Sequence, residues 1–260
     1  MDTAIDMDLN KIKQVFSDYW SMRAQTYSDD MCRIDRREDW KTELKQRVDQ
    51  RFPGRKPGDI RVLELATGHG YFAGILAELG YSVTAVDLAP GMLEVAQRNC
   101  AQYGNRIAFM QMNAEELTFA DASFDVVFSR FLTWLLPRPE TAYSEWVRVL
   151  KTDGLLLTYD TMLTKERKPE AEAPSEEEKD NPYRTELIQR TGMAAELYDD
   201  LIRLSGELEI GFLKRPDWDV SLLTGMGMDA SSENVTRLSA LKRDDDSEMS
   251  QLLLIKGVKR

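Results

Sequence analysis

Hydrophobic positions change spacing repeatedly between Arg61 and Asp160. Short apolar runs, typical of buried strands, alternate with segments whose apolar residues recur every three or four positions, as in helices. The predicted strands are 61–65, 81–87, 107–112, 124–129 and 154–160, and the predicted helices begin near Tyr71, Gly91, the region 113–117 and Arg138. Glu115 and Glu116 are interpreted as an exposed helix start. The alternation predicts a doubly wound α/β fold with a mostly parallel sheet.

Further elements are predicted on both sides of this region. They are an amphipathic helix at 9–27, a second helix at 35–51, an exposed or disordered Glu-, Lys- and Pro-rich stretch at 165–182, a helix at 186–208, and two strands near 234–238 and at 251–259. The last two strands bring the predicted sheet to seven. We therefore divide the chain into an N-terminal helical cap (1–54), an α/β core (55–160), an insertion (161–216) and the C-terminal part of the core (217–260).

The insertion at 161–216 leaves the sheet directly after the predicted fifth strand. Ligands of open α/β sheets bind outside the carboxyl ends of the strands, and the insertion starts at that edge. A polar tether followed by an amphipathic helix can move and still bury an apolar face when closed. We expect a helical lid over a ligand site, with the N-terminal helix closing the other side through Tyr19 and Trp20. The alternatives are a surface elaboration and a contact in a homodimer.

Composition and charge limit the classes of function. The 260 residues carry a formal net charge of -11, with 42% hydrophobic and 30% charged residues, which suits one α/β domain with an appendage. Long nucleic acids and anionic membranes require a basic face, so neither is an expected partner. No apolar run could span a bilayer and the N-terminus lacks signal-peptide features, so we expect a cytoplasmic protein. Cys32 and Cys100 predict no disulfide framework, and a single histidine predicts no zinc site.

The segment from Val62 to Gly70 (VLELATGHG) joins a short buried strand, a glycine-rich turn and a helix start. In α/β sheets this arrangement forms a small-molecule site, because Gly68 and Gly70 let a ligand approach the backbone amides of the helix start. Glu64 is expected to point into the same crevice. The spacing does not fit the GxGxxG motif, which disfavours a nicotinamide-dependent oxidoreductase. Asp87, which ends the second strand, is placed to accept hydrogen bonds from two ribose hydroxyls, so a nucleoside ligand is predicted.

Several motifs follow this segment in order: LAPGML at 88–93, NAEEL at 113–117, SFDVVFSR at 123–130 and WVRVLKTDG at 146–154. Together they resemble class I S-adenosylmethionine-dependent methyltransferases of the type that includes the ubiquinone and menaquinone biosynthesis methyltransferases. The resemblance implies a Rossmann-like methyltransferase fold, S-adenosyl-L-methionine as cofactor, and methyl transfer to an O, N, S or C atom by direct displacement. The alternatives are the oxidoreductase and a catalytically silent regulatory protein that binds the cofactor.

The resemblance also implies a set of cofactor-binding residues. The amino-acid end would lie by Glu64, Ala66, Thr67, Gly68 and Gly70, the ribose on Asp87, and the adenine between Leu88 and the backbone of Asn113 and Ala114, with Tyr19, Tyr27, Met92 and Ser129 in further contact. Ala66 stands where the family usually has glycine, and Asn113 where it usually has aspartate. Both changes are compatible with binding, because later glycines approach the ligand most closely and an amide can still bond an adenine amine.

The acceptor side of the site rests on a few residues. His69, inside the glycine turn, is the candidate general base; alternatively it faces solvent or backs the cofactor. Arg130 and Trp134 follow the fourth strand and, with Trp20, are predicted to line the substrate pocket. Arg130 could pair with a substrate carboxylate or with the protein's own acids. Asn181-Pro182 resembles an element of amine methyltransferases but lies in the wrong place, so we interpret it as a turn and predict a small soluble methyl acceptor.

Overall fold

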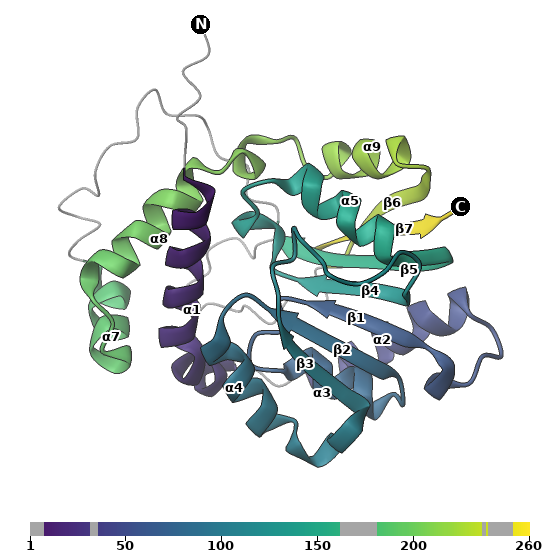
Figure 1. Ribbon diagram of the computed structural model, residues 1–260, viewed down its shortest axis with the longest axis horizontal. Helices are drawn as coiled ribbons and strands as arrows, with labels where there is room; N and C mark the ends of the chain where they lie inside the picture. The colour runs from purple at the N-terminus through teal and green to yellow at the C-terminus, as the bar shows by residue number, and fades with distance from the viewer. Residues whose placement is uncertain (1–7, 32–35, 162–180, 236–237, 239–251) are drawn as a thin grey trace, which may run out of the picture.

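Seven strands of the described residues form one sheet in the order β3-β2-β1-β4-β5-β7-β6 (Figure 1). The computed structural model describes residues 8–31, 36–161, 181–235, 238 and 252–260. The strands are β1 (Arg61–Leu65), β2 (Ser82–Asp87), β3 (Ile107–Gln111), β4 (Phe124–Arg130), β5 (Leu150–Thr161), β6 (Met228–Asn234) and β7 (Leu252–Lys259). β1 to β5 run parallel, and β7 is antiparallel to β5 and β6. The predicted doubly wound, seven-stranded α/β fold is confirmed.

Helices cover both faces of the sheet (Figure 1). They are α1 (Leu9–Met31), α2 (Arg37–Arg51), α3 (Tyr71–Glu78), α4 (Pro90–Asn99), α5 (Pro139–Val149), α7 (Pro182–Thr191), α8 (Ala195–Glu207) and α9 (Asp217–Gly225), with short 3-10 turns at Pro57–Asp59, Ala101–Arg106, Thr133–Leu135 and Glu209–Phe212. One face packs on Trp40 of α2 and Phe72 of α3, and the other on Trp146 of α5 and Leu223 of α9. Among these helices, none combines the length and the hydrophobicity that crossing a bilayer requires.

Alternation along β1 and β4 decides which side chains reach which layer. Val62 packs in the α2/α3 layer, and Glu64, two residues later, lies on the same face because strand side chains alternate. On β4 the same holds for Phe128 and Arg130. Glu64 and Phe128 are direct neighbours in the parallel register. The carboxyl ends of β1 and β4 therefore present both a carboxylate and a guanidinium on the α2/α3 side.

The described part of the insertion packs against the N-terminal helix. Helices α1 and α8 lie side by side (Figure 1). Ile12, Phe16 and Tyr19 of α1 form one apolar cluster with Leu201 and Leu204 of α8. The expectation that the insertion and the N-terminal helix close opposite sides of the site is therefore wrong, because their apolar faces bury each other. The lid and the domain boundaries stay predictions. Most of the stretch 165–182, from 165 to 180, lies outside the described residues.

Two predicted elements differ from the structure. The strand expected near 234–238 is β6 at Met228–Asn234; it is an edge strand whose polar sequence is held by backbone bonds to β7, so its sequence carries little hydrophobic signal. The single helix expected at 186–208 is two helices, because Gly192 adopts φ +69 and ends α7. Asn181 caps the start of α7 by accepting a hydrogen bond from the Tyr183 amide, so the predicted turn there is a helix start.

Candidate functional site

The turn between β1 and α3 is fixed by hydrogen bonds from its backbone amides to β2. The Thr67 amide donates to the Val86 carbonyl over 3.0 Å, and the Gly68 amide donates to Asp87 Oδ2 over 2.8 Å. The Gly70 amide donates back to the Thr67 carbonyl over 3.1 Å. The amides of Gly68 and Gly70, expected to face a ligand, are thus paired within the protein.

Three residues of this turn adopt left-handed conformations: Ala66 with φ +52, Gly68 with φ +56 and Gly70 with φ +84. The two glycines have different surroundings. A Cβ on Gly70 would stand 2.9 Å from Cys100 Sγ and 3.1 Å from the Cα of Ala96, whereas a Cβ on Gly68 would meet nothing within 4 Å. Gly70 therefore allows α3 to pack on α4, and Gly68 leaves space for a ligand.

A small cavity of about 60 Å³ lies next to the turn. It is lined by Tyr27 of α1, Trp40 of α2, Glu64 of β1, Ala66, Thr67, Gly68 and His69 of the turn, Tyr71 and Phe72 of α3, and Phe128 and Arg130 of β4. We call this cavity the β1/β4 pocket. Segments far apart in the sequence meet here because the carboxyl ends of β1 and β4 are adjacent in the sheet.

Glu64 is the buried acid of the β1/β4 pocket. Its side chain is 2% exposed and accepts a 2.9 Å hydrogen bond from Thr67 Oγ1. Burial, opposed by the Thr67 hydroxyl and reinforced by the nearby Asp87 charge, raises the pKa of Glu64 to about 8. No described residue forms an ion pair with Glu64. A cationic group in the pocket would therefore stabilise its ionised form.

Asp87 is also buried, but its oxygens are occupied differently. Oδ2 accepts from the Gly68 amide and Oδ1 from the Ala89 amide, over 2.8 and 2.9 Å. Burial raises the pKa of Asp87 to about 6 in spite of these backbone hydrogen bonds. Each carboxylate oxygen has a second lone pair. The ribose contact of Asp87 stays a prediction, and the described role of its carboxylate is to tie the glycine turn to the start of α4.

Arg130 and His69 lie on the aromatic side of the pocket. The Arg130 guanidinium carbon is 3.7 Å from the ring centre of Phe131 and 5.5 Å from those of Trp40 and Phe72. The His69 ring stands edge-on to Tyr27 at 5.5 Å. Burial, and then the Arg130 charge, lower the pKa of His69 to about 4. The imidazole is therefore neutral at pH 7 and a weaker base than one poised near that pH.

The structure brings Tyr27, Glu64, Ala66, Thr67, Gly68, His69 and Arg130 together in the β1/β4 pocket. The other predicted site residues lie outside its lining: Tyr19, Trp20, Gly70, Asp87, Leu88, Met92, Asn113, Ala114, Ser129 and Trp134. Tyr19 packs in the α1/α8 cluster, and Trp134 Nε1 donates to the Phe131 carbonyl over 2.9 Å. Sequence reasoning missed Trp40 and Phe72, whose positions depend on how α2 and α3 pack.

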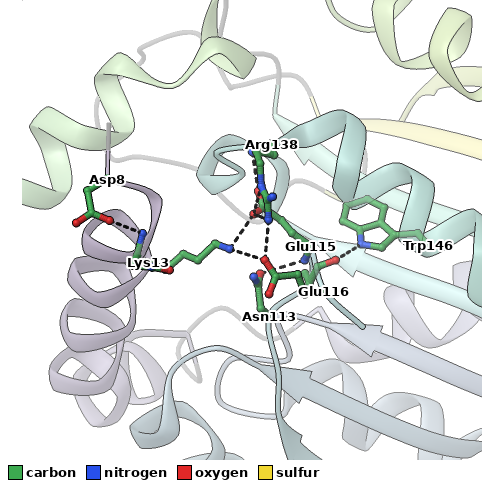
Figure 2. Close-up of polar contacts among 9 residues, drawn as sticks. Asp8, Lys13, Asn113, Glu115, Glu116, Arg138 and Trp146 are labelled. Atoms are coloured by element: carbon green, nitrogen blue, oxygen red, sulfur yellow. Dashed lines mark hydrogen bonds and ion pairs between the residues drawn. The ribbon is translucent and has the colours of Figure 1, made fainter. Parts of the chain in front are cut away.

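The loop after β3 differs from the predicted structure and contacts α1 (Figure 2). No helix forms at 113–117, because Asn113 Oδ1 accepts from the Glu115 amide and closes a turn. Glu115 is 1% exposed rather than solvent-facing and accepts a 2.6 Å hydrogen bond from the Arg138 amide. Lys13 of α1 reaches Glu115 and Glu116 at 3.3 and 3.0 Å. These charges fasten the N-terminal helix to the edge of the core.

Part of the chain is similar to known proteins. Residues 63–158 match the family described as "Methyltransferase domain". The chain is 39% identical over 110 residues to an uncharacterized protein of Haemophilus influenzae, covering 40% of this chain and 44% of that protein. It is 38% identical over 97 residues to a demethylmenaquinone methyltransferase of Clavibacter sepedonicus, covering 37% and 39%. The chain spans less than half the length of the curated relatives it matches.

Solved structures share the fold at low sequence identity. The protein solved with the Trm112 methyltransferase activator of Haloferax volcanii has a TM-score of 0.60 at 16% identity, covering 92% of this chain and 96% of that one. Phosphoethanolamine N-methyltransferase 2 of Haemonchus contortus, solved with S-adenosylhomocysteine, has a TM-score of 0.55 at 20% identity, covering 84% and 52%. With the matching family, this fold defines residues 63–158 as a class I S-adenosylmethionine-dependent methyltransferase domain.

S-adenosyl-L-methionine is the cofactor of this class of domain, and the residues present fit it. Glu64 offers a buried carboxylate without a protein cation, which suits the ammonium group of the cofactor. Gly68 leaves space where any Cβ would project. The fit therefore rests on one charged group and one open backbone position.

Proposed function

We propose that this protein is an S-adenosylmethionine-dependent methyltransferase that acts on a small soluble molecule at an O, N, S or C atom. The observation that carries the proposal is Glu64, a buried carboxylate beside the open backbone of Gly68 that no described residue pairs with a positive charge. Burial opposes ionisation of an unpaired carboxyl, and a cationic ligand in contact with it favours the charged form. S-adenosylmethionine carries an ammonium and a sulfonium.

The protein's own residues would hold the reactants and exclude water. When bound, the cofactor supplies a methyl group activated by a positively charged sulfur. Thr67 orients the Glu64 carboxylate through its hydroxyl, and Asp87 can accept ribose hydroxyls through the lone pairs that its backbone contacts leave free. The rings of Tyr27 and Trp40 line the β1/β4 pocket and would exclude water from it when the reactants are bound. Direct displacement requires that the reactants are aligned and that water is excluded, and it does not require a fixed catalytic triad.

A small acceptor is favoured by the walls of the pocket. Side chains from three helices, Tyr27, Trp40 and Phe72, surround it. A polymer end would have to displace these rings to reach the reacting centre. The net charge of -11 further disfavours a nucleic acid, whose phosphates need a basic surface.

Isothermal titration calorimetry tests the proposal. We expect the full chain to bind S-adenosylmethionine and S-adenosylhomocysteine but not NADH. Glu64→Gln should weaken S-adenosylhomocysteine binding by about tenfold or more, the loss of a charge-assisted contact. Glu94→Gln, at an exposed position of α4, is the matched control. Binding of NADH instead, or equal affinity of the Glu64 variant, would contradict the proposal. A screen for methyl transfer to small acceptors then separates an enzyme from a silent binding protein.

A further inference from the structure

Arg130 places a guanidinium in the wall of the β1/β4 pocket. It is the last residue of β4, and its charged group lies against the rings of Phe131, Trp40 and Phe72. Aromatic rings stabilise a guanidinium through its faces and leave its edge of N–H groups available for hydrogen bonds. The geometry therefore directs any further partner of Arg130 to this edge.

The edge of Arg130 lacks partners among the described residues. Its Nε is buried without a hydrogen bond, and no described carboxylate forms an ion pair with it. Burial also lowers the pKa of Arg130. The buried Arg215 also has one nitrogen without a hydrogen bond, but it differs from Arg130 because it forms an ion pair, with its Nε 2.8 Å from Asp219 Oδ2. Buried donors are nearly always paired, so the unpaired donor of Arg130 points to a partner outside the protein.

Glu64 and Arg130 are the two charged residues that line the pocket. They have opposite signs and form no ion pair with each other. Glu64 is suited to a cation, as the proposed function requires, whereas Arg130 is suited to an anion. A carboxylate matches a guanidinium best, because two parallel N–H groups meet two oxygens.

We propose that Arg130 is a carboxylate-binding residue of the β1/β4 pocket. This inference rests on the proposed function, since it names a further ligand group of the same site. Two reactants can bring the carboxylate: the methionine part of the methyl donor, or the methyl acceptor. The rings of Trp40, Phe72 and Phe131 surround the guanidinium carbon, so the carboxylate would approach its N–H edge.

The first arm of the test concerns the methyl donor. Affinities for S-adenosylhomocysteine and for its decarboxylated analogue are measured by calorimetry in the wild type, Arg130→Met, Arg130→Lys and the control Arg106→Met, which changes an exposed arginine before β3. If the donor brings the carboxylate, Arg130→Met weakens S-adenosylhomocysteine by at least about tenfold and leaves the analogue unchanged. The lysine variant keeps the charge without the planar fork and should show an intermediate loss.

The second arm concerns the acceptor and uses benzoate and benzamide as planar probes, with and without saturating S-adenosylhomocysteine. If the acceptor brings the carboxylate, the wild type binds benzoate at least about tenfold more tightly than benzamide, and Arg130→Met removes this preference. In that case S-adenosylhomocysteine affinity is the same in all variants. Either pattern supports a carboxylate site and states its source.

The proposal is overturned if Arg130→Met binds S-adenosylhomocysteine as the wild type does and the wild type does not distinguish benzoate from benzamide. Thermal unfolding monitors the fold of each variant. If the methionine variant does not fold, the lysine variant decides by the same two comparisons. Failure of the wild type to bind S-adenosylhomocysteine would contradict the proposed function alone, because the benzoate comparison without that ligand still tests Arg130.

Discussion

The two sides of the glycine turn at 66–70 differ in how fully the protein uses them. We call the side toward β2 and α4 the packed side; there Gly70 touches Cys100 and Ala96, and both oxygens of Asp87 accept backbone amides. On the open side, toward the pocket, Gly68 has free space and Glu64 has one hydroxyl partner.

This difference separates residues that build the site from residues that are left for a ligand. The two acids illustrate it, because Glu64 and Asp87 lie near the carboxyl ends of neighbouring parallel strands and are both buried. Their sequence positions look equivalent. Only the hydrogen bonds of the folded protein show the difference. Asp87 holds the turn, whereas Glu64 keeps most of its capacity to accept hydrogen bonds from a ligand.

The largest effect is expected when a glycine on either side of the turn is replaced by alanine, which adds one methyl group. Gly70→Ala should lower the free energy of unfolding by about 3 to 4 kcal/mol, because the left-handed backbone is strained and the Cβ collides with α4. Gly68→Ala has the same backbone strain without the collision and should cost only about 1 kcal/mol. Urea unfolding measures both. Equal losses would mean that the packed and open sides do not differ.

The next effect concerns Asp87. Asp87→Ala leaves the amides of Gly68 and Ala89 without an acceptor and should lower the free energy of unfolding by about 3 kcal/mol. It should also weaken S-adenosylhomocysteine binding, measured by calorimetry at a temperature where the variant is folded. Asp87→Asn keeps one oxygen acceptor and should lose less stability. An alanine variant as stable as the wild type would contradict a structural role for Asp87.

Glu64 makes stability depend on pH. Its pKa in the folded protein is about 8 against an ordinary value of 4.5, so between these values the folded state keeps a proton that the unfolded state has lost. The free energy of unfolding should therefore fall as pH rises through this window, by up to about 1.4 kcal/mol per pH unit, and level off above pH 8.

Glu64→Gln removes this ionisation, and the difference between the two proteins isolates it from all other groups. On the order of 2 kcal/mol should separate their pH profiles between about pH 5 and pH 7. Parallel profiles in urea titrations would show that Glu64 is not buried as an unpaired acid.

The smallest expected effect is a gain. Ala66 has φ +52, a conformation that costs an L-residue about 1 kcal/mol and costs glycine little. Ala66→Gly should therefore raise the free energy of unfolding by less than about 1 kcal/mol, because the larger entropy of the unfolded glycine chain offsets part of the relieved strain. Thermal unfolding of this variant beside Ala101→Gly, outside the turn, provides the control. A loss of stability at position 66 would show that the turn is not strained there.

Hydrophobic spacing predicts most of the sheet because each central strand is buried on both faces and must be apolar. β6 was misplaced because an edge strand depends on backbone pairing, which polar residues can also make. The helix expected at 113–117 was wrong because a side chain, Asn113, satisfies the backbone there. In both places local hydrogen bonds decide the structure, and the spacing of hydrophobic residues does not predict it.

The sequence predicts those residues of the candidate site that belong to a continuous motif. The run from Glu64 to His69 follows from the strand-turn-helix motif, and Arg130 from its place after β4. Trp40 and Phe72 could not be predicted as pocket residues, because their apolar character fits any buried helix face. Only the packing of α2 and α3 against β4 brings their rings to Arg130.

The pairing of α1 with α8 sets an order of events during synthesis. Ile12 and Phe16 emerge early from the ribosome, but their partners Leu201 and Leu204 emerge only after the strands β1 to β5. Domains generally form as their residues become available, so the parallel strands can pair while the apolar face of α1 is still exposed. Nascent chains arrested before residue 195 should therefore carry an exposed apolar helix, a surface that chaperones recognise, and lose it once α8 has been made.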